Sequence, residues 1–373
     1  MRLESQAIIN DVKAYIDRHS EVGEDSTASE QEFGELALKI FNFQCEYNAA
    51  YRNYAKLKRK LPHQLASWRD IPPMPIQAFK RSPLSCEPPE HAAAVFMTSG
   101  TTHPEQRGRQ YHPTFEVWDA SMRTGFRPFV MGEVAKLRVF SLSPAEDIYT
   151  DSSLSRYLSQ AIRLFGTSGS ESYFRHDGLA VEQLLADLRA CEEEAEPVLL
   201  LGATFAYVPL LDTMEKLGIR FRLAPGSRIL DTGGFKGKSR EVSMDWLYEK
   251  LAQCFGVPRS LCVNMYGMTE LCSQYYDTTI LTGVSTSMKR GPAWLRPLVL
   301  DPTTLLPAAE GTVGVLAHFD LANWNSCVAI LTEDIGVMRG GSFELMGRIA
   351  GSEARGCSLA VEQFIQSNGL ATS

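Results

Sequence analysis

The sequence is short of basic charge and of long apolar runs. Its 37 Lys and Arg residues are outnumbered by 44 Asp and Glu residues, which gives a net charge of −7, so the chain lacks the positive field with which proteins hold nucleic acid. The longest stretch without a charged residue, 197–211, is interrupted by two prolines and a glycine. A helix needs about 20 apolar residues to cross a bilayer. We therefore expect neither a nucleic-acid partner nor a membrane span.

CxxC cysteine pairs and metal-binding histidine spacings are also missing, and the first residues do not have the pattern of a signal peptide. The eight cysteines include no CxxC pair, and the seven histidines show no HxxxH pattern, the spacings typical of zinc sites. No apolar signal-peptide core follows the first Arg, so we expect a cytoplasmic location with reduced thiols. No G-x-S-x-G elbow is present, which argues against a hydrolase.

What the chain does have is the composition of a folded protein. Hydrophobic residues make up 44% and charged residues 22%, as in ordinary globular domains. Apolar residues recur at helical spacing in 8–16 and 33–41, and seven prolines interrupt 61–89, where each removes a backbone donor. We predict a helical N-terminal segment and proline-rich connector over 1–90.

Beyond the connector, short apolar runs alternate with helical patterns over 91–310. The strand-like runs are HAAAVFMTSG, KLRVFSLS, PVLLLG, RFRL and SLCVNMYG, and the helical patterns cover 154–164, 179–188, 208–217 and 246–255. This alternation predicts an α/β fold whose largely parallel sheet is covered by helices. Over 311–373 the runs GTVGVLAHF, CVAILTEDIG and SFELMGRI predict a β-rich subdomain and a tail.

Two motifs in this α/β region suggest a nucleotide site. The hydroxyl-rich loop TSGTT, 98–102, leaves a strand-like run, and such a loop can wrap a phosphate with N–H and O–H donors. The motif YGMTE, 266–270, offers an aromatic ring for a base, a hydroxyl for a phosphate and a carboxylate for Mg²⁺. Each alone is more simply a turn or corner. Their order on an α/β pattern favours the nucleotide site.

A third motif, RGCS at 355–358, places a cysteine beside an arginine and a glycine. A thiol becomes a useful acyl acceptor when a nearby cation stabilises its thiolate. From the residues alone, a small buried cysteine is the more frequent explanation for Cys357. The other seven cysteines lie in apolar contexts and are expected in the core.

In their order along the chain, TSGTT, DTGGFKG, YGMTE, LTEDIG and MGR resemble the adenylate-forming superfamily of acyl-activating enzymes from about Ala92 onward. The stretches IPPMPIQAFKRSPL and SEARGCSL are similar to the LuxE-type acyl-protein synthetases of bacterial bioluminescence. The resemblance implies an adenylate-forming core, Mg²⁺ and ATP as cofactors, and a fatty acid as the carboxylic acid substrate.

The resemblance also implies roles for single residues. It assigns the ATP phosphates to Thr98, Ser99, Gly100, Thr101 and Thr102, the adenine pocket to Gly233, Gly234, Tyr266 and Gly267, the α-phosphate to Thr269, Mg²⁺ to Glu270, the ribose to Asp334, the hinge to Arg348 and the acyl group to Cys357. For Asp334 alone, a capping or turn carboxylate is the more frequent explanation.

The sequence departs from the superfamily pattern in two places. After Thr102 the superfamily continues to a Gly and a Lys, whereas this chain has His-Pro-Glu-Gln over 103–106. The chain also ends soon after Arg348, so we expect the full C-terminal catalytic domain, with its catalytic Lys, to be absent. The candidate replacements for that Lys are Lys236, foremost, and Lys238, Arg107 and Arg109, unless a partner supplies it. All four are equally explained as surface charges.

The predicted function is an ATP-dependent acyl-protein synthetase. It would form an acyl-adenylate, transfer the acyl group to the Cys357 thiol, and deliver it to a partner such as an acyl reductase. One alternative keeps adenylation but uses coenzyme A or a carrier-protein thiol, which leaves Cys357 structural. Another is a degenerate, non-catalytic nucleotide-binding subunit. Transfer between proteins is compatible with an oligomer.

Overall fold

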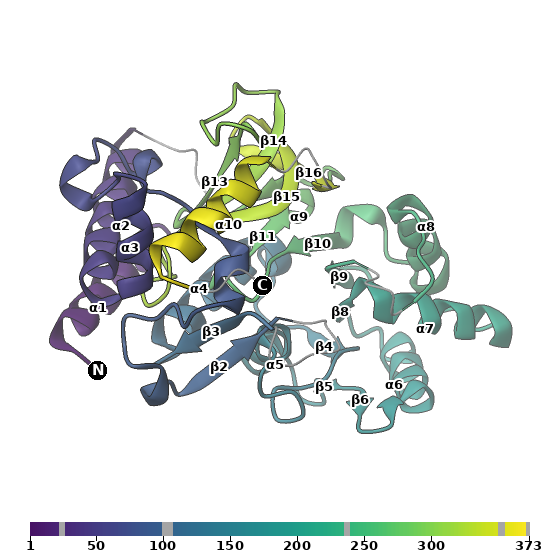
Figure 1. Cartoon of the computed structure of the whole chain (residues 1–373). Coiled ribbons are helices and arrows are strands. Elements are labelled where there is room, and N and C mark those ends of the chain that lie inside the picture. Colours follow the sequence, from purple (N-terminus) through teal and green to yellow (C-terminus); the bar gives the residue numbers. More distant parts are fainter. Residues whose placement is uncertain (22–26, 99–106, 235–238, 350–354, 371–373) are drawn as a thin grey trace. The chain divides into compact units, whose positions relative to one another are not determined.

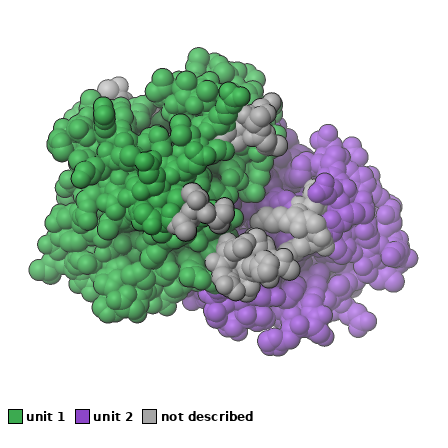
Figure 2. Space-filling view, viewed as in Figure 1, with its two compact units in different colours: residues 1–125, 268–275, 288–373 green, residues 126–267, 276–287 purple. Residues whose placement is uncertain are grey.

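The computed structural model describes residues 1–21, 27–98, 107–234, 239–349 and 355–370, and the chain forms two compact units. Unit 1 contains 1–125, 268–275 and 288–373, and unit 2 contains 126–267 and 276–287. Figure 2 colours the two units separately. Each unit therefore joins residues that are far apart in the sequence, and the division into 1–90, 91–310 and 311–373 stays a prediction.

Unit 1 begins with three helices, α1 (Leu3–Arg18), α2 (Thr27–Tyr47) and α3 (Ala49–Leu57), drawn in purple in Figure 1. The predicted apolar stripe of α1 is buried, since its buried residues include Ile8, Ile9, Val12 and Ile16. Such a stripe is how an amphipathic helix packs on a core. Asn48 caps α3 by accepting a hydrogen bond from the Tyr51 N–H. The predicted N-terminal helices are confirmed.

The proline-rich connector forms short turns and one brief strand. The turns are η1 (Pro62–Gln64), η2 (Trp68–Asp70), η3 (Ile76–Lys80) and η4 (Pro89–His91), and the strand is β1 (Met74–Pro75). Strand β1 runs parallel to β15 (Ala329–Arg339), with Met74 opposite Ile330. The connector is thus tied to the sheet of unit 1 through the pairing of β1 with β15.

The rest of unit 1 is an antiparallel sheet, a hairpin and two helices. The sheet strands are β12 (Lys289–Arg290), β13 (Leu295–Leu300), β14 (Val313–Asp320), β15 and β16 (Ser342–Arg348), the hairpin is β2 (Ala94–Met97) with β3 (Arg109–His112), and the helices are α4 (Glu116–Phe126) and α10 (Arg355–Ser367). Strands β13 to β16 pair in chain order and β12 pairs with β16. The three strands predicted after residue 311 are confirmed, whereas α10 was not predicted as a helix.

Among the described residues of unit 2, five strands form a parallel sheet in the order β10-β9-β8-β4-β5. They are β4 (Arg138–Ser141), β5 (Glu171–Ser172), β8 (Val198–Ala203), β9 (Arg228–Thr232) and β10 (Cys262–Tyr266). Every residue of β8 and β9 is buried, as expected of parallel strands covered on both faces. The predicted α/β fold is confirmed.

Helices connect these strands. They are α5 (Ser153–Phe165), α6 (Val181–Glu193), α7 (Thr204–Leu217) and α8 (Met244–Phe255), close to their predicted positions. Shorter elements are η6 (Arg127–Met131), β6 (Phe174–Arg175), β7 (Gly178–Leu179), η7 (Arg259–Leu261), α9 (Thr279–Thr282) and β11 (Tyr275–Asp277), at which the chain passes between the units.

One strand-like run in this region does not form a strand. The N–H groups of Phe221 and Leu223, in RFRL, donate instead to the carbonyl oxygens of Cys254 (2.7 Å) and Phe255 (3.0 Å) at the end of α8. The last carbonyls of a helix have no partner within the helix, so the run satisfies a helix end. None of the described helices has the length and apolar character of a membrane span.

Candidate active site

The first residue of the hydroxyl-rich loop, Thr98, binds Gly108 in unit 1. Thr98, after β2, donates its N–H to the Gly108 carbonyl oxygen, and the Gly108 N–H donates to Thr98 Oγ1, both at 2.9 Å. Arg107 donates to the carbonyl oxygens of Thr98 (2.7 Å) and Met97 (3.3 Å). Ser99, Gly100, Thr101 and Thr102, predicted to bind phosphates, lie outside the described residues. The base of the loop is therefore closed by main-chain and guanidinium contacts.

The side chain of Glu270 lies at the base of this loop. A Cβ placed on Gly108 would be 3.0 Å from Thr98 Cγ2 and 3.2 Å from Glu270 Oε1, which is closer than most Cβ contacts, so a glycine keeps this space open. Glu270 is buried and Thr269 is half-buried. The fold thus brings the first residue of TSGTT and the last of YGMTE together, as a shared nucleotide site requires.

The donor set around Glu270 suits Mg²⁺ that arrives with a substrate. Mg²⁺ keeps several waters and is usually held by one or two carboxylates together with substrate phosphates. Within the described part of the chain, no group of three or more His, Cys, Asp and Glu residues is arranged to hold a metal. The buried Glu270 carboxylate near Thr98 therefore fits a phosphate-borne Mg²⁺ better than a metal cage made by the described residues alone.

Two further predicted site residues meet across neighbouring strands of unit 1. Asp334 of β15 is opposite Arg348 of β16, and Arg348 Nε lies 2.9 Å from Asp334 Oδ1. Asp334 is buried, whereas the Arg348 side chain is 73% exposed. Asp334 thus lies within a strand and not in a turn.

Cys357 lies in the first turn of α10. Its thiol is 3.7 Å from the Thr332 carbonyl oxygen, and a Cβ on Gly356 would be 2.5 Å from the Pro302 carbonyl oxygen, so this turn requires a glycine. Cys357 is one of the residues that line a pocket of about 480 Å³, together with Gln77, Glu333, Ile349, Ser358, Val361 and Glu362. The predicted acyl acceptor therefore borders a space in which a ligand can lie.

The charge state of this thiol differs from the sequence-based expectation of a stabilised thiolate. Burial, and secondarily the negative charge of Glu333, raise the pKa of the Cys357 thiol to about 11. Arg355, the cation in the motif, is exposed. Cys357 is consequently a neutral thiol near pH 7, and its reaction with an acyl group requires a proton acceptor. Gln77 Nε2 donates to Glu333 Oε1 at 2.8 Å, which fixes the nearest carboxylate of that pocket.

In unit 2, the predicted adenine-pocket residues emerge at one edge of the parallel sheet. Gly233 and Gly234 follow β9, while Tyr266 ends β10 and Gly267 follows it. The two strands are parallel, with Thr232 opposite Met265, so these residues leave the carboxyl edge side by side. Gly233 has a φ of +72°, which favours glycine. Open α/β sheets bind ligands at this edge.

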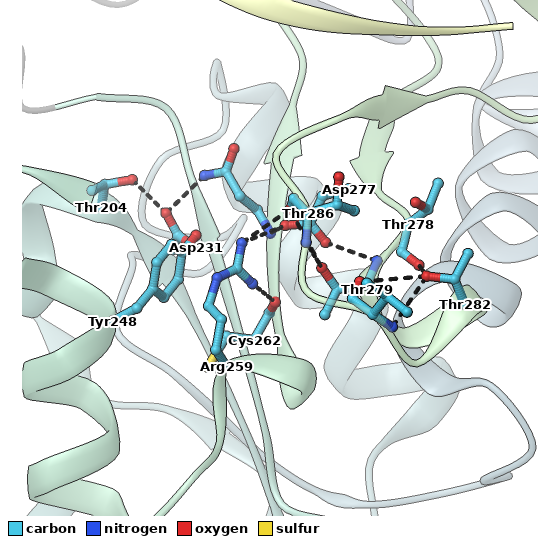
Figure 3. A network of polar contacts seen from close by, with 12 residues as sticks. Thr204, Asp231, Tyr248, Arg259, Cys262, Asp277, Thr278, Thr279, Thr282 and Thr286 are labelled. Carbon is cyan, nitrogen blue, oxygen red and sulfur yellow. Dashed lines mark hydrogen bonds and ion pairs between the residues drawn. The ribbon is translucent and has the colours of Figure 1, made fainter. Parts of the chain in front are cut away.

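A buried polar network that the sequence analysis did not predict supports this edge (Figure 3). Asp231, fully buried in β9, accepts hydrogen bonds from Tyr248 O–H (2.8 Å), Asn264 Nδ2 (2.8 Å) and Thr204 Oγ1 (3.0 Å). Thr204 Oγ1 also lies 3.0 Å from the Gly233 carbonyl oxygen. The detectable sign was an aspartate within the apolar run RILDT, since buried charges need several donors.

A second carboxylate continues the network. Asp277 Oδ2 accepts from the Asn264 N–H (2.9 Å) and pairs with Arg259 (3.3 Å). Arg259 Nη1 also donates to the Cys262 carbonyl oxygen, and its guanidinium stacks 3.9 Å from the Tyr248 ring centre. The start of β10 and the end of β9 are thereby held by one connected set of contacts.

The candidates for a cation that assists adenylation differ in where they lie. Lys236 and Lys238 lie outside the described residues, and Arg109 is exposed on β3. Arg107 holds the loop base, as above. The cation that assists adenylation stays a prediction.

The family of the chain follows from comparisons with known proteins. The family model of acyl-protein synthetases, LuxE, matches residues 17–366. A long-chain-fatty-acid–luciferin-component ligase of Aliivibrio fischeri is 23% identical over 350 residues, which cover 89% of this chain and 88% of the relative. The enzyme of the same name from Vibrio harveyi is 23% identical over 197 residues, half of each chain.

A crystal structure of 2-hydroxyisobutyryl-CoA ligase in the postadenylation state superposes with a TM-score of 0.63 at 14% identity, over 89% of this chain and 70% of that one. At this identity the likeness shows the fold alone, which is that of adenylate-forming enzymes. Because the family model matches most of its length, the chain belongs to the acyl-protein synthetase (LuxE) family of AMP-forming ligases.

Proposed function

We propose that the protein activates a fatty acid with ATP and stores the acyl group as a thioester on Cys357 for a partner protein. Acyl activation follows from the family. The observation that carries the proposal for this chain is the meeting of Thr98 and Glu270 at Gly108, because it joins the start of the phosphate loop to the proposed metal ligand.

In the first step, an oxygen of the fatty-acid carboxylate attacks the α-phosphorus of ATP, and the bond to pyrophosphate breaks. Residues 98–102 and Thr269 would contact the phosphates, and Glu270 would hold Mg²⁺. The bound Mg²⁺ would supply charge neutralisation on the phosphates. Fixed donors and charges are the main means by which proteins promote such displacements. Lys236 is our candidate for the assisting cation.

The nucleoside would be held by separate residues. Gly233, Gly234 and Gly267 would leave room for adenine, with Tyr266 stacking on it, and Asp334 would accept from the ribose hydroxyls. Because glycine has no side chain, a ring can approach its backbone closely. Arg348 would orient Asp334 through the ion pair between β15 and β16.

In the second step, the Cys357 thiol gives its proton to an acceptor, for which Glu333 is the nearest candidate in the pocket. The sulfur attacks the acyl carbonyl carbon, a C–S bond forms, and the bond from that carbon to the AMP oxygen breaks. The products are the acyl-enzyme and AMP. A thioester on Cys357 then awaits transfer to a partner thiol, such as that of an acyl reductase.

The test is exchange of labelled pyrophosphate into ATP with a series of carboxylic acids, followed by acylation with labelled fatty acid. We expect fatty acids to support exchange, and Cys357→Ser to keep exchange but lose the thioester that hydroxylamine cleaves. Absence of exchange with any acid would point to a non-catalytic nucleotide-binding subunit.

One observation favours a second candidate. The Cys357 thiol is buried and its pKa is raised to about 11, as expected of a structural cysteine. In that case coenzyme A or a carrier-protein thiol would take the acyl group directly. If the Cys357→Ala variant still forms the thioester product with either acceptor, this alternative is supported.

A further inference from the structure

Two buried amide side chains of unit 1 donate hydrogen bonds to the backbone of Glu270. Asn323 Nδ2 donates to the Glu270 carbonyl oxygen at 2.9 Å, and Gln110 Nε2 donates to the same oxygen at 3.1 Å. Asn323 and Gln110 are each 1% exposed. A buried carbonyl that receives two donors is firmly placed, because leaving it unpaired is costly.

The same asparagine also holds the residue two positions further along the chain. Asn323 Oδ1 accepts from the Cys272 N–H at 2.8 Å, so one side chain spans Glu270 and Cys272. Asp320 Oδ2 accepts from the N–H groups of Cys272 (3.0 Å) and Ser273 (2.9 Å). All these contacts are made to main-chain atoms of residues 270–273. They fix the backbone of Glu270, and that backbone sets the direction of its side chain.

Asn323 lies in the loop that follows β14, whereas Gln110 lies on β3. Asp320 ends β14, and its Oδ1 accepts from the Ala322 N–H at 2.9 Å. Asn323 Nδ2 further donates to the Cys327 carbonyl oxygen at 3.2 Å. The loop that carries Asn323 is therefore itself rigidly built, as a support for a catalytic group should be.

We propose that Asn323 is a positioning residue, which aims the Glu270 carboxylate at Mg²⁺ by clamping the backbone on both sides of Leu271. This inference rests on the proposed role of Glu270 as the metal ligand. Loss of an outer group that orients a metal ligand typically weakens metal binding by about 10- to 100-fold. Asn323 does not itself touch the substrate.

The chain contains a matched control two residues away. Asn325 is also buried, donates from Nδ2 to the Tyr111 carbonyl oxygen (2.9 Å) and Ser85 Oγ (3.0 Å), and accepts from the Glu87 N–H (3.0 Å). It has the same chemistry and a similar number of contacts as Asn323. These three contacts of Asn325 do not involve residues 270–273.

The test measures how much Mg²⁺ strengthens binding of α,β-methylene-ATP to the full-length protein. The dissociation constant is determined with and without Mg²⁺ for the wild type, Glu270→Gln, Asn323→Asp and Asn325→Asp. The Asp replacements keep the acceptor oxygen but replace the amide donor with a second oxygen. We expect Asn323→Asp to lose about tenfold of the Mg²⁺ gain and Asn325→Asp to retain the wild-type gain.

The outcomes distinguish the proposed metal role of Glu270 from the proposed positioning role of Asn323. If the wild type gains no affinity from Mg²⁺, or Glu270→Gln keeps the full gain, the proposed metal role of Glu270 is wrong. If Glu270→Gln loses the gain while Asn323→Asp keeps it, Asn323 is not a positioning residue. An equal loss in Asn325→Asp would also overturn the inference, because general loosening would then explain it. Asn323→Ala, which adds no charge, provides the same measurement if the Asp variant does not fold.

Discussion

His318, on strand β14, is expected to make the folded protein less stable in acid. Its ring is fully buried, its Nδ1 lies 3.0 Å from the Tyr275 hydroxyl oxygen, and it packs near the rings of Tyr275 and Phe343. Opposite it on the neighbouring strands are Pro297 and Ile330. Burial lowers the pKa of His318 from 6.5 to about 3, because this environment disfavours the imidazolium.

The size of the effect follows from that difference. Between pH 6.5 and pH 3 the unfolded chain binds a proton at this histidine that the folded chain does not, so the free energy of unfolding falls as the pH falls. At about 1.4 kcal/mol per pH unit, His318 alone should remove about 2 kcal/mol between pH 7 and pH 5. The contribution is complete above pH 6.5, where both states are neutral.

A carboxylate on the same strand acts in the opposite direction. Burial raises the pKa of Asp320 from 3.8 to about 6, so in this range the folded chain binds the extra proton, and the free energy of unfolding rises as the pH falls through 6 toward 3.8. The change with pH in the total free energy of unfolding therefore understates the effect of His318. Only a difference between two variants that both retain Asp320 isolates it.

The assay is urea unfolding of the wild type and His318→Gln at pH 7, 6 and 5, followed by far-UV circular dichroism. Glutamine cannot be protonated and keeps a hydrogen-bonding group near Tyr275. We expect the wild type to lose about 2 kcal/mol relative to His318→Gln between pH 7 and pH 5. If the unfolding free energies of the two proteins change equally with pH, the reasoning is refuted. That result would mean that His318 titrates alike in the folded and unfolded states.

Three further predictions concern the site. Gly108→Ala places a methyl group against Thr98 and Glu270, so pyrophosphate exchange should fall about tenfold or more; unchanged exchange would mean that this space is not used. Thr204→Val removes a donor from the buried Asp231, which should lower the urea unfolding free energy by about 1–3 kcal/mol, while Thr204→Ser should restore it. Arg348→Ala should cost less than about 1 kcal/mol of stability, because its side chain is mostly exposed, and a much larger loss by the same assay would show that the ion pair with Asp334 has a structural role.

The sequence by itself determined the local elements and the order of the motifs. Helical spacing identified α1 and α8, apolar runs identified β8 and β10, and the strands after residue 311 were found from their alternation. Such periodicity is local, since it depends only on which side of a helix or strand faces the core. The motif order was also enough to indicate the family, which the comparisons then showed. The roles of the single site residues stay predictions.

Tertiary structure alone decided which distant groups meet and in what charge state. The clamp on Glu270 joins residues 53 and 160 positions away in the chain, and no spacing rule links Thr204 to Asp231 and Asn264. These contacts depend on strand register and side-chain direction, which the sequence pattern does not encode. The same holds for Cys357: the motif suggested a thiolate beside a cation, whereas burial in α10 makes it a neutral thiol, because the solvent around a group decides its ionisation as much as its neighbours in the chain.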